Sequence, residues 1–169
     1  MKKQVRNNVF ETNSSSTHSI CISKKPVVTE DLSGKYVYFQ PGEFGWEFEK
    51  YDDLEDKASY LYEAITDFYF DEKECSDVLN KLYETLGKYG VSCKFKPKKK
   101  DKYGFTEGYI DHVNELAEFL KAVFHSENRL LRFLFGDSFI LTGNDNCYED
   151  EVPQYNVPES EYEIYYKGN

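Results

Sequence analysis

The sequence predicts an α+β fold: a mostly antiparallel sheet with about four helices packed on it, in a single domain covering residues 1–169. Two observations lead to this prediction. Segments with alternating apolar residues are mixed with segments in which apolar residues recur every three or four positions, in no regular order. The chain also contains 15 Tyr, 13 Phe and 1 Trp, enough aromatic packing area for a hydrophobic core at this length.

Five segments are predicted to be strands. The clearest is SICISK, which begins at Ser19 and places Ile20 and Ile22 on one side of an extended chain, as half-buried strands do. Residues 35–40 (KYVYFQ) alternate in the same way and lie between Ser-Gly and Pro-Gly turn signals. The other three predicted strands are residues 91–96, 138–143 and 161–168.

Four segments are predicted to be helices. In residues 51–70, apolar residues recur at helical spacing and acidic residues crowd the first turn, where the helix dipole favours them. Asp52 or Asp53 is the predicted cap of this helix. Residues 109–124 show the clearest helical period, and Ser126 is predicted to cap the short helix after it. The remaining predicted helix covers residues 75–88.

Charge is unevenly distributed along this acidic chain, whose formal net charge is −10 at pH 7. Residues 43–74 carry twelve acidic and three basic side chains, and residues 145–163 carry seven acidic and no basic ones. Since both blocks would repel phosphates, we do not expect the protein to bind nucleic acid directly. The like-charged stretch KPKKKDK, at residues 96–102, is predicted to form an exposed loop.

Four cysteines, at positions 21, 75, 93 and 147, are spread far apart without CxxC spacing, which favours reduced thiols. The opening residues lack the apolar stretch of a signal peptide, and the sequence has no apolar run long enough to span a membrane. We therefore expect a soluble, cytoplasmic protein without membrane contact.

No metal site and no cofactor are predicted. His112 and Glu115 lie three residues apart in a predicted helix, but the second histidine of an HExxH motif is missing. The oxygen-rich residues 144–151 do not fit the ligand register of an EF-hand. They are therefore interpreted as a solvated acidic loop.

Residues 13–19, NSSSTHS, form the one segment that looks built for a site. This hydroxyl run lies within residues 1–25, which carry five basic side chains and one acidic one, a setting that suits an anion such as phosphate. The run contains no glycine, so it is not a P-loop. The predicted ligand-binding residues are Arg6, Ser14, Ser15, Ser16, Thr17 and His18.

Two other interpretations of the hydroxyl run stay open. In one, a hydroxyl is a nucleophile and His18 is its base, because Ser16 and His18 would point the same way on an extended chain. That chemistry also requires a third group to orient the imidazole. In the other, the hydroxyls bond to nearby backbone groups, as in turns and caps, and the run has a structural role.

The first acidic block supports a different hypothesis. Its carboxylates, interleaved with Tyr and Phe, would imitate phosphates and enter a basic groove on a partner protein, where the aromatic residues anchor the contact. An ordinary solvated helix face is the plainer interpretation. The predicted partner-binding residues are Asp52, Asp53, Glu55, Asp56, Asp67, Asp71, Glu72 and Glu74.

The opening of the chain from Arg6 to Ser19, RNNVFETNSSSTHS, resembles an uncharacterised group of proteins from bacteriophages and Firmicute mobile elements that begin with an FETNSSSTHS-type motif. The resemblance covers only this segment. It implies a phage or mobile-element setting in a bacterial host cell, where small acidic proteins often inhibit host defence. It identifies no catalytic residue.

Two classes of function follow. The first is a binding protein without enzymatic activity, such as an inhibitor of a CRISPR effector or restriction enzyme, whose acidic surface occupies a basic groove of a host protein. The second is an enzyme or ligand-binding protein that uses the hydroxyl run on a phosphorylated or nucleotide substrate. The sequence leaves this choice, and the oligomeric state, open.

Overall fold

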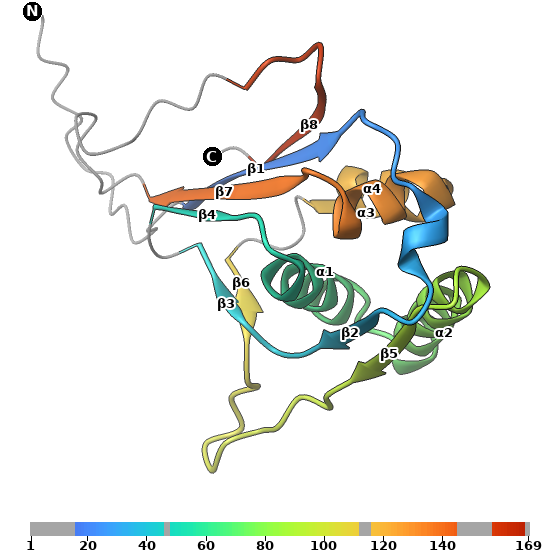
Figure 1. Ribbon diagram of the computed structural model, residues 1–169. Coiled ribbons are helices and arrows are strands. Elements are labelled where there is room, and N and C mark those ends of the chain that lie inside the picture. Colours follow the sequence, from blue (N-terminus) through green and yellow to red (C-terminus); the bar gives the residue numbers. More distant parts are fainter. Residues whose placement is uncertain (1–15, 46–47, 112–115, 145–156, 168–169) are drawn as a thin grey trace, which may run out of the picture.

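A computed structural model describes residues 16–45, 48–111, 116–144 and 157–167. Within these residues the chain forms a four-stranded antiparallel sheet, two short parallel strand pairs and four α-helices (Figure 1). The α+β class predicted from the sequence, with helices packed against a mainly antiparallel sheet, is confirmed. None of the described helices is long and apolar enough to cross a membrane.

The main sheet has the strand order β4-β7-β1-β8, and all of its neighbouring strands are antiparallel. Its strands are β1 (Ser16–Ser23), β4 (Glu49–Tyr51), β7 (Phe139–Asn144) and β8 (Tyr162–Lys167). Strand β1 lies in the interior of the sheet, so that Ile20 is opposite Ile140 on one side and Tyr165 on the other. The strand predicted around Ile20 is therefore a central one.

Two pairs of short parallel strands lie apart from the main sheet, on the other side of the long helix that follows β4 (Figure 1). They are β2 (Tyr36–Phe39) with β5 (Ser92–Phe95), and β3 (Glu43–Phe44) with β6 (Tyr109–Ile110). In β2, Val37 and Phe39 are buried while Tyr36 and Tyr38 keep contact with solvent. This alternation is the period of two from which the strand is predicted.

Four α-helices and one 3₁₀ helix complete the described fold. They are α1 (Leu54–Phe68), α2 (Glu72–Lys88), α3 (Ala117–His125), α4 (Glu127–Phe135) and the 3₁₀ helix η1 (Thr29–Leu32). Asp53 caps α1 by accepting a hydrogen bond from the Asp56 amide, in agreement with the predicted cap, and Asp71 caps α2. Ser126 occupies the cap position of α4, but its side chain makes no capping hydrogen bond.

The helix predicted over residues 109–124 is wrong in its first part. Tyr109 and Ile110 form strand β6, and α3 begins at Ala117. Ile110 is buried and pairs with Phe44 of β3. Strand pairing and burial outweigh the local helical period here, because intrinsic helix propensities differ by less than about 1 kcal/mol per residue.

Helix α1 lies at the centre of the fold, between the main sheet and the two parallel pairs, and the other three helices pack beside it (Figure 1). Its nine residues from Lys57 to Ile65 are all buried. Phe44 and Phe119 pack edge-on against the ring of Tyr60. The amphipathic sequence pattern predicts that one face of this helix is exposed to solvent. In the structure, residues 57–65 are instead buried on every side of the helix.

Polar side chains of the buried stretch reach four separate parts of the chain. The contacts join the Tyr60 hydroxyl and His18 Nδ1 (2.8 Å), the Tyr62 hydroxyl and the Lys96 carbonyl (2.7 Å), Lys57 Nζ and the Gly136 carbonyl (3.0 Å), and the Gly42 amide and the Glu63 carboxylate (3.1 Å). A buried polar group without a partner costs about 1–3 kcal/mol. These contacts therefore supply hydrogen-bond partners to the buried polar side chains of α1, and they also hold the surrounding segments against the helix.

Removing the Tyr60 hydroxyl tests this role. Tyr60→Phe keeps the ring but takes a hydrogen-bond partner from buried His18, so the free energy of unfolding should fall by about 1–3 kcal/mol. Tyr83→Phe is the matched control, because Tyr83 is 57% exposed, and it should change stability by less than about 0.5 kcal/mol. Urea denaturation followed by circular dichroism measures both values. Equal stability of the two variants would contradict a structural role for the Tyr60 hydroxyl.

Candidate functional site

The hydroxyl run enters the main sheet. Strand β1 starts at Ser16 and not at Ser19, so the second half of the run is paired backbone and not loop. Most of the predicted ligand-binding groups are not in the described part of the structure. These are Arg6, Ser14 and Ser15, together with the side chains of Ser16 and Thr17. Anion binding and catalysis by these groups stay predictions.

His18 is the predicted ligand-binding residue whose side chain is described, and it is 1% exposed. It lies on the same face of β1 as Ile20 and Ile22, with its ring centroid 5.7 Å from that of Tyr60. Burial raises the pKa of Tyr60 well above its usual value, so the phenol stays neutral. An imidazole buried against a neutral phenol fits the structural interpretation of this residue.

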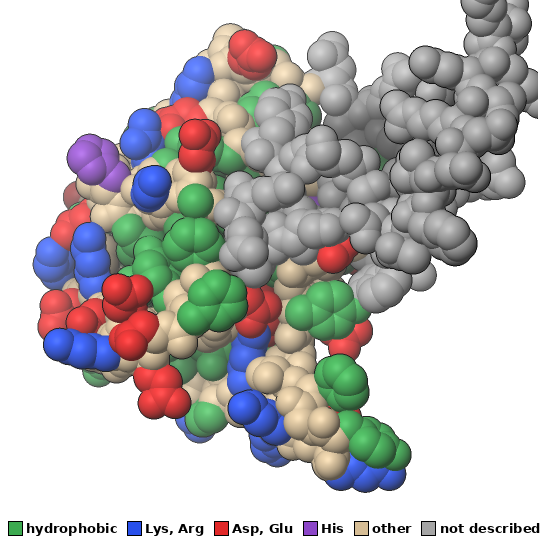
Figure 2. All heavy atoms as spheres, turned by 180° about the vertical axis from the view of Figure 1, so that it is seen from behind, with side chains coloured by type: hydrophobic (Ala, Val, Ile, Leu, Met, Phe, Trp, Pro, Cys, Tyr) green, Lys and Arg blue, Asp and Glu red, His purple; other side chains and the backbone are tan. Residues whose placement is uncertain are grey.

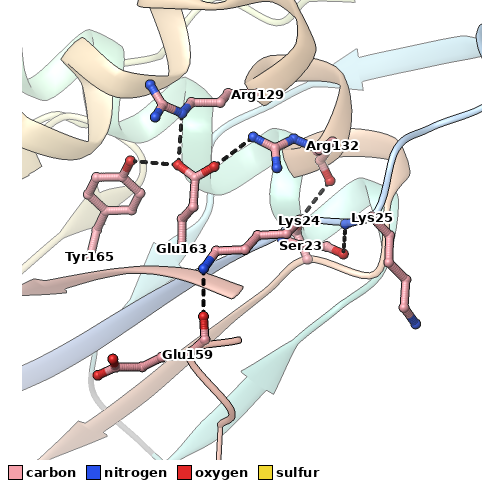
Figure 3. A network of polar contacts seen from close by, with 9 residues as sticks. Ser23, Lys24, Lys25, Arg129, Arg132, Glu159, Glu163 and Tyr165 are labelled. Atoms are coloured by element: carbon pink, nitrogen blue, oxygen red, sulfur yellow. Dashed lines mark hydrogen bonds and ion pairs between the residues drawn. The ribbon is translucent and has the colours of Figure 1, made fainter. Parts of the chain in front are cut away.

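Two lysines of the positive amino-terminal segment are engaged by contacts within the protein. Lys24 Nζ donates a hydrogen bond to the Glu159 carbonyl at 2.6 Å (Figure 3), and Lys25 forms an ion pair with Asp137 at 3.2 Å. The electrostatic argument for an anion at the hydroxyl run counts both lysines. That argument is therefore weaker in the folded protein than in the sequence.

Next to these lysines, Glu163 of β8 is held by two arginines of α4 (Figure 3). Its two oxygens accept hydrogen bonds from Arg129 and Arg132, each at 2.8 Å. Burial alone would raise the pKa of Glu163, but the arginines outweigh it and hold the pKa below its usual value. This contact fastens the outer strand of the sheet to α4.

The eight predicted partner-binding residues divide into two groups at the two ends of α1. One group, Asp52, Asp53, Glu55 and Asp56, surrounds the start of α1, and the other, Asp67, Asp71, Glu72 and Glu74, surrounds its end and the start of α2. Asp67 follows Asp53 by fourteen positions of helix, a distance of about 21 Å. The two groups therefore form two patches and not one continuous surface.

The patch at the end of α1 has internal partners for two of its four carboxylates. Asp71 accepts hydrogen bonds from the Lys73 and Glu74 amides, and Asp67 forms an ion pair with Lys98. Glu72 and Glu74 are exposed in the first turn of α2, where the helix dipole favours negative charge. These residues are accounted for by the fold.

The other patch, here called the amino-terminal acidic patch, consists of Asp52, Asp53, Glu55 and Asp56 together with Glu49 of β4. Lys50 lies 2.5 Å from Asp52 and lowers the pKa of that carboxyl. The pKa of Asp56 is raised, first by partial burial and then by the negative charges of Asp53, Glu55 and Glu49. A cation that approached Asp56 would relieve this repulsion.

A pocket of about 350 Å³ opens beside the amino-terminal acidic patch. This tyrosine pocket is lined by Tyr36, Val37, Tyr38, Leu54 and Glu55. Tyr36 leaves 55% of its surface exposed, and Glu55 belongs both to the pocket and to the patch. Aromatic faces next to carboxylates suit an arginine or lysine side chain, whose stem packs on the rings while its charge meets the acids.

A second pocket, of about 260 Å³, lies between η1 and the end of α4. Its rim carries Lys25 and Lys35 as well as Asp31 and Asp137. Because both signs of charge are present and Lys25 pairs with Asp137, this pocket favours no class of ligand.

A buried carboxylate that sequence reasoning missed lies in the second half of α1. The Glu63 side chain is fully buried, and its second oxygen lies 2.5 Å from Lys98 Nζ. Burial raises the pKa of Glu63 to about 7, against the opposing effect of Lys98. In the sequence Glu63 falls off the apolar stripe of its helix and so resembles a solvated residue.

Metal and thiol chemistry find little support in the described part of the chain. It holds no group of three or more His, Cys, Asp and Glu residues that would bind a metal ion, and His112, Glu115 and Cys147 fall outside it. Cys21, Cys75 and Cys93 are free thiols. Burial raises the pKa of Cys21 to about 12, so this thiol is not activated for nucleophilic attack.

A scan against protein-family models found no match to this chain, and searches of curated proteins and of solved structures found none either.

Gly108 tests the packing around Glu63. Its φ is +75°, and a Cβ there would lie 2.2 Å from Glu63 Oε1 and 2.9 Å from the ring of Pro41. Gly104→Ala is the matched control, since Gly104 has a φ of +90° and open space around it. Gly104→Ala should cost about 1–2 kcal/mol from the backbone alone. Gly108→Ala should cost clearly more in the same denaturation experiment, and an equal loss would contradict a tightly packed carboxylate.

The raised pKa of Glu63 gives a pH dependence of stability. Between its ordinary value of 4.5 and about 7, the folded state holds a proton that the unfolded state has lost, so stability falls as pH rises through this window. The loss should reach at most about 3 kcal/mol and be complete above the folded-state pKa. Glu63→Gln should show a smaller fall between pH 4.5 and 7 in denaturation curves. A parallel pH profile in both proteins would refute the assignment.

Proposed function

We propose that the protein acts by binding, and that the amino-terminal acidic patch and the tyrosine pocket together receive a basic surface of a partner protein. The observation that carries this proposal is their shared residue, Glu55, which places an aromatic-lined pocket directly beside a cluster of five carboxylates. Glu55 also accepts a hydrogen bond from the Gln40 side chain at 2.8 Å, so one of its oxygens is already engaged. Charge at such a surface steers association, and buried aromatic contacts supply most of the affinity.

An arginine side chain fits both parts at once. Its guanidinium would stack on Tyr36 or Tyr38 and pair with Glu55, while a neighbouring basic residue would relieve the repulsion at Asp56. At the other end of α1, Asp67 and Asp71 are held by internal contacts, whereas Glu55 of the amino-terminal patch lines the tyrosine pocket. We therefore assign the partner-binding role to the amino-terminal patch.

The partner that we propose is a host enzyme with a basic nucleic-acid groove, of the CRISPR-effector or restriction type. Support comes from the acidic, tyrosine-bearing surface and from the phage-like motif at the start of the chain. A carboxylate surface in such a groove would exclude the phosphates that normally occupy it. The enzymatic alternative depends on Arg6 and the serine side chains of the hydroxyl run, so it stays a prediction.

Neutralising the patch tests this proposal. A panel of purified CRISPR effectors and restriction enzymes is titrated with the protein, and their binding to target DNA is measured at increasing salt. Inhibition by the wild type should weaken as salt rises. The double variant Glu55→Gln/Asp56→Asn should inhibit about tenfold less, a loss of about 1.4 kcal/mol.

The matched control is Glu72→Gln/Glu74→Gln, which removes the same charge from the other patch and should inhibit like the wild type. Thermal melts check that both double variants are folded. Equal losses in the two variants would show that net charge alone is responsible, which would contradict a specific site. Failure of the wild type to inhibit any enzyme of the panel would overturn the proposed partner class.

A further inference from the structure

A narrow arm, residues 97–107 between β5 and β6, projects from the body of the protein (Figure 1). Lys100 and Thr106 form an antiparallel bridge across it, and the Asp101 amide donates to the Phe105 carbonyl at 2.8 Å. The sequence predicts only an exposed, self-repelling loop for this region. The structure shows a hairpin with a defined tip.

The tip of the arm is held by its own hydrogen bonds. Asp101 Oδ1 accepts from the Tyr103 amide at 2.8 Å and from the Phe105 amide at 2.9 Å. Gly104 between them adopts a φ of +90°, which the turn requires and which other residues rarely adopt. At the base, Lys98 pairs with buried Glu63, so the arm is tied to the core.

Two aromatic side chains at this tip are left in solvent. Tyr103 is 72% exposed and Phe105 is 74% exposed. Figure 2 shows hydrophobic and basic side chains gathered at the end of this projection. Because these two rings point away from the core, they do not contribute to core packing. Their exposure therefore needs an explanation other than the stability of the fold.

The five lysines of residues 96–102 fall into two classes. Lys96 pairs with Glu107 at 2.8 Å and Lys98 pairs with Glu63, so both serve the base of the arm. The other three, Lys99, Lys100 and Lys102, are exposed and form no ion pair with a described carboxylate. The Lys102 ammonium lies 4.8 Å from the centroid of the Tyr103 ring, so a positive charge and an aromatic face are next to each other on the surface of the tip.

We propose that the tip of the arm binds single-stranded nucleic acid. Bases would stack on Tyr103 and Phe105, and the phosphates between them would meet Lys99, Lys100 and Lys102. Aromatic platforms combined with positive charge are the means by which proteins hold single strands without reading their sequence. A duplex offers phosphates but hides the faces of its bases, so it would leave the rings unused.

The acidic body of the protein does not prevent this contact. The tip lies at the far end of the projecting arm (Figure 1), and physiological salt screens charge over about 8 Å. The expectation that nucleic acid is repelled rests on the acidic blocks and does not extend to this tip. A lipid surface fits less well, because inserting the rings would also bury Asp101, which lies beside them in the turn.

Fluorescence anisotropy with labelled oligo(dT) and oligo(U), using the full chain, tests the proposal. The binding constant should fall with salt at a log–log slope of about −2, as three phosphate contacts on a single strand require. Lys99→Gln/Lys100→Gln/Lys102→Gln should reduce the slope to near zero. Tyr103→Ser/Phe105→Ser should weaken binding by about fivefold or more.

Phe70→Ser is the matched control, since Phe70 is 83% exposed but lies between α1 and α2, and it should bind like the wild type. Glu55→Gln/Asp56→Asn should also bind normally, because the arm does not depend on the proposed partner site. Absence of binding at low salt, equal affinity for duplex DNA, or an equal loss in Phe70→Ser would each overturn the proposal. Binding only to vesicles of phosphatidylcholine and phosphatidylglycerol would replace it with a membrane contact.

Discussion

The constraint on which this structure depends is the burial of one helix on every side. Nine successive residues of α1 are buried, and they include Lys57, Ser59, Tyr60, Tyr62 and Glu63. A helix in this position cannot leave its polar groups to water, so the surrounding segments must supply their partners. The contacts that result run to β1, to the segment after β5, to the end of α4 and to the loop before β3. Each contact fixes an element that is distant in sequence.

The surfaces assigned to function begin where that burial ends. At its first turn α1 emerges with Asp53 as its cap and Glu55 and Asp56 beside it, in the positive field of the helix terminus. Toward its other end, Glu63 and Asp67 hold Lys98 and thereby the base of the arm. The rigid centre thus sets the positions of both proposed contacts. This is the usual division between a packed scaffold and the segments that it presents.

Much of the fold could be predicted from the sequence, because long elements carry their own periodicity. The strand around Ile20, the strand at Val37 and the helix that contains Leu61 are examples, and the cap at Asp53 follows from side-chain chemistry. Strands β3 and β6 have two residues each, too few to show any period. These two strands form because they pair with each other in the folded chain, and the local sequence pattern does not reveal that pairing.

The candidate sites were less predictable than the fold. The acidic residues could be named, but their division between the two ends of α1 and the pocket at Glu55 depend on packing. His18 and Glu63 show the same limit, since a polar residue in the sequence gives no sign that a distant tyrosine or lysine will bury it. Most of residues 96–102 is exposed as predicted, but Lys98 is 11% exposed and pairs with buried Glu63. The turn in which Asp101 accepts the Tyr103 and Phe105 amides is also not evident from the sequence.

The two proposed contacts have opposite charge and begin near opposite ends of one helix, and this arrangement restricts what they would recognise together. A partner with only a basic groove would bind the amino-terminal acidic patch and make no contact with the arm. A free strand of nucleic acid would use the arm and be repelled by the body. An enzyme with a single strand emerging from its groove presents both charges on one surface. Such a complex would engage both ends at once, and because the contacts share a rigid scaffold, the second would form at a high effective concentration.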